Sequence, residues 1–129
     1  MVWTKKGSGE MIKIEAIVRE EKLEDVKDAL NEIDVHGFTI TQVMGCGHQR
    51  GYSSFVRGSK VDINVLPKIK FEIVVSSQEW ADKTIKTIEE VAKTGNPGDG
   101  KIFVYNLTDA VRIRTGERGK AAIKISEVE

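Results

Sequence analysis

The sequence is poor in several features that mark specialised classes of protein. It holds one cysteine, Cys46, so no disulfide can form within the chain, which suits a reducing compartment. No apolar run approaches the roughly 20 residues that a membrane-spanning helix needs. Lysine plus arginine and aspartate plus glutamate number 20 each, and this zero net charge gives no general attraction to nucleic acid or to a membrane surface. We therefore expect a cytoplasmic protein whose binding sites are local.

Length and composition predict one folded domain. The 129 residues, 40% of them hydrophobic, suffice for a single core, and no shift in composition marks a second. Residues 1–10 contain Gly, Ser and Lys but no apolar stretch like that of a signal peptide, so we interpret them as a flexible leader or an expression remnant. The domain is expected over residues 11–122, with a C-terminal tail over residues 123–129.

Hydrophobic periodicity predicts the order strand, helix, strand, repeated once. Period-two alternation indicates strands over residues 12–18 and 68–75. Residues 38–44 are rich in β-branched and aromatic residues and indicate another strand, and a fourth begins at Ile102. Apolar residues spaced three and four apart indicate amphipathic helices over residues 23–33, ending near Gly37, and over residues 80–92, closed by Gly95 and Pro97. Two such units in series describe a ferredoxin-like α+β domain, βαββαβ, with both helices on one face of an antiparallel sheet.

Apolar residues are also expected on the sheet face away from the helices. Ile17, Val43 and Val74 fall there by alternation. A small domain that exposes such positions usually buries them by association, so we expect a homo-oligomer.

A long segment separates the second and third predicted strands. GCGHQRGYSSFVRGSKVDINVLP contains four glycines and no sustained periodicity. It is either a disordered insertion or a functional loop, and compact domains rarely keep so long a loop without using it.

Three segments combine glycine with cations in a way that indicates phosphate binding. They are GCGHQRG (45 to 51), TGNPGDGK (94 to 101) and RIR (112 to 114). Glycine lets backbone N–H groups approach an anion, and Lys or Arg supplies the countercharge. Arg112 and Arg114, two apart on a segment expected to be extended, should point the same way. Neither glycine segment has the spacing of GxGxxG or of a P-loop.

Other chemistries find less support in the residues. Cys46 and His48 would need carboxylates from elsewhere to close a metal site, and no third group is at hand to orient a Cys–His nucleophile. Asp99 lies between two glycines and is better explained as a turn residue than as a general base. Single-stranded nucleic acid binding is disfavoured because only 6% of residues are aromatic.

These residues resemble those of the PII family of nitrogen-regulatory signal-transduction proteins. TGNPGDGKIFV (94 to 104) followed by RIRTGERG (112 to 119) is similar to the C-terminal signature of that family, and MIKIEAIVREEKLEDVKDAL (11 to 30) resembles its first strand and helix. GCGHQRG and LPKIKFEIVV (66 to 75) resemble the ends of its long T-loop and the strand that follows.

The resemblance implies a homotrimer that binds ATP or ADP in three clefts between subunits and performs no essential catalysis. The positions carried over to the nucleotide site are Ile17, Thr39, Gly45, Cys46, Gly47, His48, Gln49, Val74, Gly98, Asp99, Gly100, Lys101, Arg112 and Arg114. It further implies that 2-oxoglutarate binds beside MgATP, with Mg²⁺ held by the side-chain oxygen of Gln49, the phosphates and the 2-oxo acid. Lys68 and the loop from Gln49 through Arg50 to Gly51 would complete the 2-oxoglutarate site.

Two departures from the family pattern bear on function. His48 stands where many members have an Arg, and a mostly neutral imidazole supplies less countercharge to phosphate. Val56 and Val61 replace tyrosines of proteobacterial members, of which the second is uridylylated, so that modification is impossible here. Ser59 matches a serine that cyanobacterial relatives phosphorylate, and is a candidate modification site.

The functional hypothesis is a switch in which nucleotide and 2-oxoglutarate bias the T-loop and a target protein binds it. The implied targets are an ammonium channel, enzymes of nitrogen assimilation such as glutamine synthetase, and nitrogenase or transcription regulators. Membrane association would come only through a channel partner. Two rivals remain: a PII-like sensor of another ligand, such as a cyclic dinucleotide, and a small ATP-hydrolysing enzyme that clamps phosphates with Lys101 and the arginines.

Overall fold

The computed structural model describes residues 11–48, 54–56, 59–61 and 63–124. Its elements, in chain order, are β1 (Ile12–Arg19), the 3₁₀ turn η2 (Glu20–Lys22), α1 (Leu23–Glu32), β2 (Thr39–His48), β3 (Ser54–Val56), β4 (Ser59–Val61), β5 (Ile63–Val75), α2 (Gln78–Ala92), β6 (Gly100–Asn106) and α3 (Lys120–Ile123).

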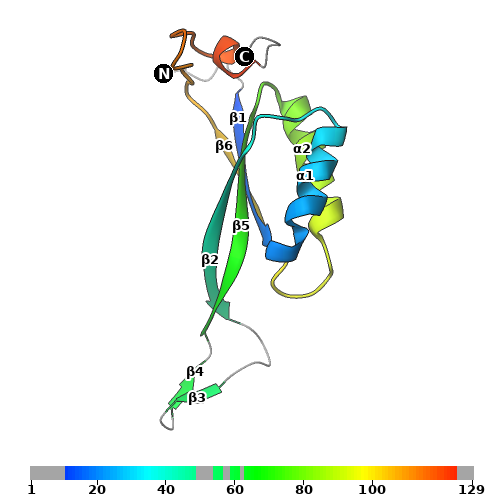
Figure 1. Cartoon of the computed structure of the whole chain (residues 1–129), viewed down its shortest axis with the longest axis vertical. Helices are drawn as coiled ribbons and strands as arrows, with labels where there is room; N and C mark the ends of the chain where they lie inside the picture. Colours follow the sequence, from blue (N-terminus) through cyan, green and yellow to red (C-terminus); the bar gives the residue numbers. More distant parts are fainter. Residues whose placement is uncertain (1–10, 49–53, 57–58, 62, 125–129) are drawn as a thin grey trace.

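The main sheet has four strands in the order β2-β5-β1-β6, and every neighbouring pair is antiparallel. Both long helices, α1 and α2, cover the same face of this sheet (Figure 1). This order and layering confirm the predicted ferredoxin-like α+β fold. None of the described helices is long and apolar enough to span a membrane.

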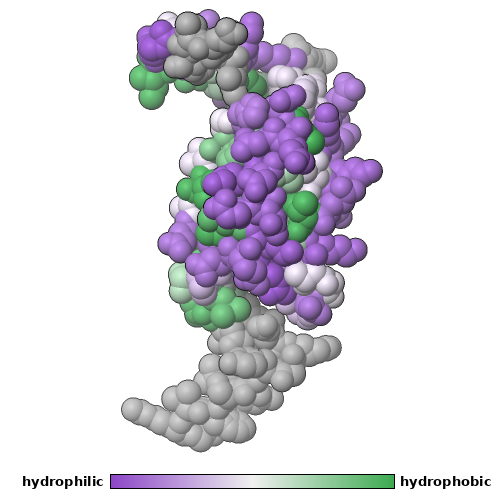
Figure 2. Space-filling model, turned by 45° about the vertical axis from the view of Figure 1, so that its right-hand side comes forward, coloured by the Kyte–Doolittle hydropathy of each residue, from purple (hydrophilic) through white to green (hydrophobic). Residues whose placement is uncertain are grey.

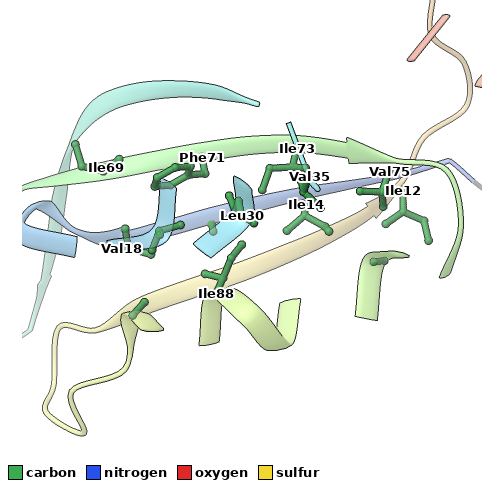
Figure 3. Close-up of a cluster of buried hydrophobic side chains, with 14 residues drawn as sticks. Ile12, Ile14, Val18, Leu30, Val35, Ile69, Phe71, Ile73, Val75 and Ile88 are labelled. Carbon is green, nitrogen blue, oxygen red and sulfur yellow. The ribbon is translucent and has the colours of Figure 1, made fainter. Parts of the chain in front are cut away.

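The core lies between the sheet and the two helices (Figure 3). In β1 the buried residues alternate with partly exposed ones along the whole strand, as the sequence predicted. Phe71 from β5, Leu30 from α1 and Ile88 from α2 are buried almost completely. Thr84 is the one buried polar residue among those described, and its hydroxyl donates to the Trp80 carbonyl one turn earlier at 2.8 Å. Trp80 itself stays 37% exposed at the margin of the core.

Local signals fix the helix ends. Ser77 precedes α2, and its hydroxyl accepts a hydrogen bond from the backbone N–H of Trp80 at 3.1 Å, which caps the helix. The first helix ends at Glu32, earlier than expected, because the chain turns at Asp34 with φ of 64° and the Val35 N–H returns to the Leu30 carbonyl.

Two strands are longer than the sequence predicted. The prediction ended the second strand at residue 44 and began the third at residue 68, but the ladder continues, pairing Gly45 with Leu66 and His48 with Ile63. This extension runs past the helices (Figure 1), so no core imposes a periodic pattern on its sequence. The two strands project beyond the helices as an arm, and β3 pairs with β4 at its end (Figure 1). The segment was predicted as one long loop; in its described parts the ends belong to β2 and β5, and β3 and β4 lie between them.

The sheet face opposite the helices mixes ion pairs with apolar side chains. Lys13 pairs with Glu72 at 3.1 Å and Lys70 with Glu15 at 3.7 Å, and the Tyr105 hydroxyl donates to Glu15 at 2.9 Å. Because residues paired across antiparallel strands share a face, the register places the expected residues here as well: Ile17, Val43 and Val74. The helix side, by contrast, is mostly hydrophilic in Figure 2.

Candidate functional site

The loop that joins α2 to β6 is organised around the carboxylate of Asp99. This carboxylate accepts hydrogen bonds from the Thr94 hydroxyl at 2.5 Å and from the backbone N–H groups of Thr94 and Gly95 at 2.8 and 2.9 Å. The Arg19 guanidinium, from the end of β1, is its fourth donor, at 3.0 Å. These donors, led by the Thr94 hydroxyl, hold the pKa of Asp99 far below its usual value. The carboxylate is therefore ionised at neutral pH and fixes the fold of its own loop.

Gly98 and Gly100 adopt backbone angles that favour glycine. Their φ values are +102° and +106°. A Cβ at Gly100 would lie 1.8 Å from the Ile17 carbonyl oxygen, so the start of β6 can approach β1 only without a side chain. A Cβ at Gly98 would lie 3.2 Å from the Arg19 guanidinium. The two glycines thus allow the loop to lie close against the end of β1.

Lys68 connects this loop to the base of the arm. Its ammonium donates a hydrogen bond of 2.5 Å to the Gly98 carbonyl. A Cβ at Gly45 on the neighbouring strand would lie 3.0 Å from Cγ of Lys68, so the absence of a side chain at Gly45 makes room for the lysine stem. Two of the glycine segments, at Gly45 and Gly98, therefore meet Lys68, which the family resemblance had named, at one end of the sheet.

A cavity of about 350 Å³ adjoins this end of the sheet, between α2 and the edge strand β6. Its polar wall contains Asp99 and Lys101, and its apolar wall contains Ile17, Ile85 and Ile88. Within the described ranges, no cluster of three or more His, Cys, Asp or Glu side chains could hold a metal ion.

Thr39 and Val74 lie further along the sheet from this cluster. Thr39 pairs with Glu72, and Val74 pairs with Lys13, whereas Ile17 pairs directly with Lys101. The chain therefore brings Ile17, Gly45, Lys68 and the 98–101 segment together and leaves Thr39 and Val74 apart from them.

The arginines expected beside Lys101 lie at the other end of the sheet. The segment after β6, which carries Arg112 and Arg114, lies at the end opposite the α2–β6 loop (Figure 1). The seven residues of β6 separate the two ends by roughly 20 Å at about 3.3 Å per residue. Lys101 and Arg112 of one chain cannot contact the same phosphate group.

The expectation that Arg112 and Arg114 share an extended segment was wrong. Residues 111–118 form a tight hairpin in which Val111 pairs with Arg118 and the Gly116 N–H donates to the Arg112 carbonyl at 2.7 Å. Gly116, with φ of +78°, allows this reversal. Arg112 lies partly buried and donates to the carbonyls of Ala121 and Lys124, while Arg114 is exposed in the turn. The two side chains therefore have different surroundings.

The other described residues of the predicted site lie on the arm. Cys46 is exposed, and the backbones of Gly47 and His48 belong to β2, paired with Asn64 and Ile63. Ser59 belongs to β4, where it pairs with Val56. Gln49, Arg50 and Gly51 lie outside the described residues.

Sequence reasoning missed Arg19. It contacts the loop twice, through Asp99 at 3.0 Å and the Pro97 carbonyl at 2.8 Å. Its only signal in the sequence is a cation at the end of the first strand. That signal becomes informative only when β1 is known to lie beside β6, 80 residues away in the chain.

Comparison with known proteins identifies the family. The family described as "Nitrogen regulatory protein P-II" matches residues 11–117. Nitrogen regulatory protein P-II 1 of Methanothermobacter thermautotrophicus is 51% identical over 113 residues, covering 88% of this chain and 97% of the relative. Nitrogen regulatory protein P-II of Rhodospirillum rubrum is 47% identical, covering 88% and 100%.

Two solved structures share the fold. The GlnK–ATP complex of B. subtilis is 43% identical with a TM-score of 0.74, covering 89% of this chain and 99% of that one. Arabidopsis thaliana PII bound to citrate is 38% identical with a TM-score of 0.70, covering 88% and 92%.

Fold and site together define a small α+β protein in which a glycine-rich loop meets Gly45 and Lys68 at one end of a ferredoxin-like sheet. The chain belongs to the P-II family of nitrogen regulatory proteins. It is therefore a signal-transduction regulator and not an enzyme, which agrees with the hypothesis drawn from its residues.

Proposed function

We propose that this P-II protein senses ATP, ADP and 2-oxoglutarate as a cytoplasmic homotrimer and transmits its ligand state to nitrogen-metabolism targets through the arm. The observation that carries the proposal is the convergence of Gly45, Lys68 and Gly98 at the base of that arm. A ligand that occupies the loop around Gly98 must affect Lys68, and through β5 the arm that follows from the same strand.

The positions of the cations support a nucleotide site shared between subunits. Lys101 and the hairpin of Arg112 and Arg114 lie at opposite ends of one sheet, so both can serve one triphosphate only if they come from different chains. The relative from B. subtilis has been solved as an ATP complex. Glycine backbone and lysine at one end of this chain, and the arginine hairpin at the other, provide the donors that phosphate oxygens require.

The open face of the sheet supports the trimer. Of its apolar members, Phe103 is 42% exposed and Ile17 is half-buried within the described part of the chain. The charges that they neighbour are already paired, Lys13 with Glu72 and Lys70 with Glu15. Association could therefore bury this face without leaving those charges unpaired. Sedimentation at micromolar concentration should show a trimer, and a monomer would contradict the shared site.

Carboxylate binding is the second part of the proposal. The plant relative has been solved with citrate, a polycarboxylate. In this chain the Lys68 ammonium lies at the base of the arm, where a carboxylate could replace the Gly98 carbonyl as its acceptor. We propose that 2-oxoglutarate binds there with MgATP, and that Gln49 contributes an oxygen to the magnesium shell, which suits the preference of Mg²⁺ for octahedral oxygen ligands. Arg50 and Gly51 would add donors from the loop.

The nucleotide site proposed here takes its residues from both ends of the sheet. They are Ile17, Thr39, Gly45, Cys46, Gly47, His48, Gln49, Val74, Gly98, Asp99, Gly100 and Lys101, with Arg112 and Arg114 supplied by a neighbouring subunit. Since both oxygens of Asp99 are engaged by its own loop and Arg19, any contact from Asp99 to the nucleotide would come from its backbone.

Calorimetry with ATP, ADP and 2-oxoglutarate, in all combinations and with and without Mg²⁺, tests the proposal. Binding of 2-oxoglutarate that requires MgATP is expected. Tight binding of a cyclic dinucleotide with no response to 2-oxoglutarate would instead assign the chain to a sensor of another ligand. The target would remain to be identified among channels, assimilatory enzymes such as glutamine synthetase, and regulators, by capture with each ligand state.

A further inference from the structure

The Asp99 carboxylate is engaged entirely within the protein. One oxygen accepts from the Thr94 hydroxyl and from Arg19, and the other accepts from the backbone N–H groups of Thr94 and Gly95. The Thr94 hydroxyl in turn accepts from the Asn96 N–H at 3.1 Å. These bonds close the first half of the loop on itself, so the side chain of Asp99 determines the loop's shape.

Arg19 holds the same loop from outside. Its Nε donates to Asp99 at 3.0 Å and its Nη2 donates to the Pro97 carbonyl at 2.8 Å, so one guanidinium spans two points of the loop. Both members of the Arg19–Asp99 pair are about three-quarters shielded from water, with side-chain exposures of 23% and 24%. A planar guanidinium can make two such directed bonds at once, which a lysine ammonium at the same place cannot match in geometry.

The strand register places Arg19 beside another cation, and Asp99 offsets the resulting repulsion. Arg19 on β1 pairs directly with Lys68 on β5, so two cations stand opposite each other across neighbouring strands. Like charges at such positions repel. Asp99 neutralises one of them, while Lys68 turns to the Gly98 carbonyl. The charge of Arg19 is thus balanced inside the protein, and those of Lys68 and Lys101 stay available to a ligand.

We propose that Arg19 is a positioning residue of the nucleotide site, which holds residues 94–101 in the shape that lets Gly98, Gly100 and Lys101 bind phosphate and makes no contact with the nucleotide itself. This inference rests on the nucleotide binding proposed above. It assigns Asp99 and Arg19 to one unit: removal of either member releases the same loop.

A double-mutant cycle tests whether the two residues act as a unit. MgATP affinity is measured by calorimetry for Arg19→Gln, for Asp99→Asn and for the double variant, all as intact trimers. Each single substitution should weaken binding about tenfold, the effect of one charged hydrogen bond. The double variant should bind MgATP about as weakly as the single variant with the lower affinity, because either single substitution already breaks the Arg19–Asp99 pair and releases the same loop. Arg19→Lys should recover part of the affinity, since it keeps the charge and one contact.

Hydrogen exchange supplies a readout that does not depend on ligand. The backbone N–H groups of Thr94 and Gly95 donate to Asp99. In the nucleotide-free protein their exchange should be faster in Arg19→Gln than in the wild type, and slower in Arg19→Lys than in Arg19→Gln. Lys27→Gln is the matched control, because it removes one cation from a surface ion pair, Glu24–Lys27, on α1. Its affinity and exchange should equal those of the wild type.

The possible outcomes separate this inference from the proposed function. Losses that add in the double variant would show that Arg19 and Asp99 do not act as one unit, and would overturn the inference. Wild-type affinity or unchanged exchange in Arg19→Gln would overturn it as well. A wild-type protein that binds no ATP would overturn both proposals, whereas normal wild-type binding with an unaffected Arg19→Gln variant overturns this one alone.

Discussion

The Lys68 ammonium donates a hydrogen bond of 2.5 Å to the carbonyl oxygen of Gly98, 30 residues further along the chain. Lys68 lies on β5 where that strand leaves the core for the arm, and Gly98 lies in the loop before β6. This hydrogen bond links the base of the arm directly to the proposed nucleotide loop. A ligand anion that competes for the lysine must break it.

Lys68→Gln should therefore lower 2-oxoglutarate affinity more than MgATP affinity. Loss of a charged hydrogen bond to carboxylate corresponds to roughly 1.5–3 kcal/mol, about tenfold or more in affinity. The affinity for MgATP is expected to fall less than about threefold, since Lys68 contacts the proposed nucleotide loop only at the Gly98 carbonyl. Calorimetry of each ligand at saturating concentration of the other measures both effects.

Lys86→Gln, an exposed lysine on α2, is the control and should bind both ligands as the wild type does. Equal losses of affinity for the two ligands in Lys68→Gln would contradict the assignment of Lys68 to the 2-oxoglutarate site. They would indicate that the lysine acts only by holding the Gly98 loop.

Gly100→Ala should destabilise the protein and abolish nucleotide binding. The new Cβ would lie 1.8 Å from the Ile17 carbonyl oxygen, and φ at this residue is +106°. Backbone strain of this kind costs on the order of 1–3 kcal/mol before β6 moves to relieve the contact. Thermal and urea denaturation should show the loss of stability.

Gly95→Ala offers a matched comparison in the same loop. Its φ of +92° is also unfavourable for alanine, but no atom lies within 4 Å of the added Cβ. The variant should be destabilised less than Gly100→Ala. Equal losses of stability would show that the dihedral angle, and not the contact with β1, limits this position.

The fold was predictable because its signals are local. Alternation along β1 and the three-and-four spacing of apolar residues in α1 and α2 report which face of each element is buried. The extension of β2 and β5 into the arm was not predictable, because those residues pair through their backbones without a core to impose periodicity.

The residue types of the proposed site follow from the sequence, but their arrangement in space does not. Glycine and cation content identified the three segments, since phosphate binding requires those residue types. The hairpin that separates Arg112 from Arg114 depends on Gly116, and the role of Arg19 depends on β1 lying next to β6. Both are consequences of tertiary structure that no local pattern reports.

Lys101→Ala and Arg112→Ala should each weaken ATP binding by roughly 1.5–3 kcal/mol, and trimers that mix the two variants should recover intact sites. The two residues lie at opposite ends of one sheet, so a shared site takes each from a different chain. In a random one-to-one mixture, about a quarter of the sites would combine an intact Lys101 with an intact Arg112. Calorimetry after refolding the mixture measures this fraction. Failure of the mixture to regain any tight sites would place both residues in one subunit's site or in none.

The proposed magnesium link between ligands predicts reciprocal coupling. If Gln49 binds a Mg²⁺ ion that ATP and 2-oxoglutarate share, each ligand completes the site of the other, so MgATP raises 2-oxoglutarate affinity and 2-oxoglutarate raises MgATP affinity by the same factor. ADP lacks the γ-phosphate oxygens that help to position the metal and should give little enhancement. Chelation of Mg²⁺ should remove the enhancement seen with ATP.

Gln49→Ala tests this link at its proposed metal ligand. The change removes a side-chain oxygen and leaves Gly45 and Gly98 in place, so 2-oxoglutarate affinity should fall much further than ATP affinity. The His48 imidazole supplies less countercharge to phosphate than an arginine would, so the titrations require MgATP concentrations well above the dissociation constant of MgATP. Under those conditions, independent binding of the two ligands in the wild type, or a larger loss of ATP than of 2-oxoglutarate in Gln49→Ala, would contradict the shared metal, because a bridging ion must couple the groups that it joins.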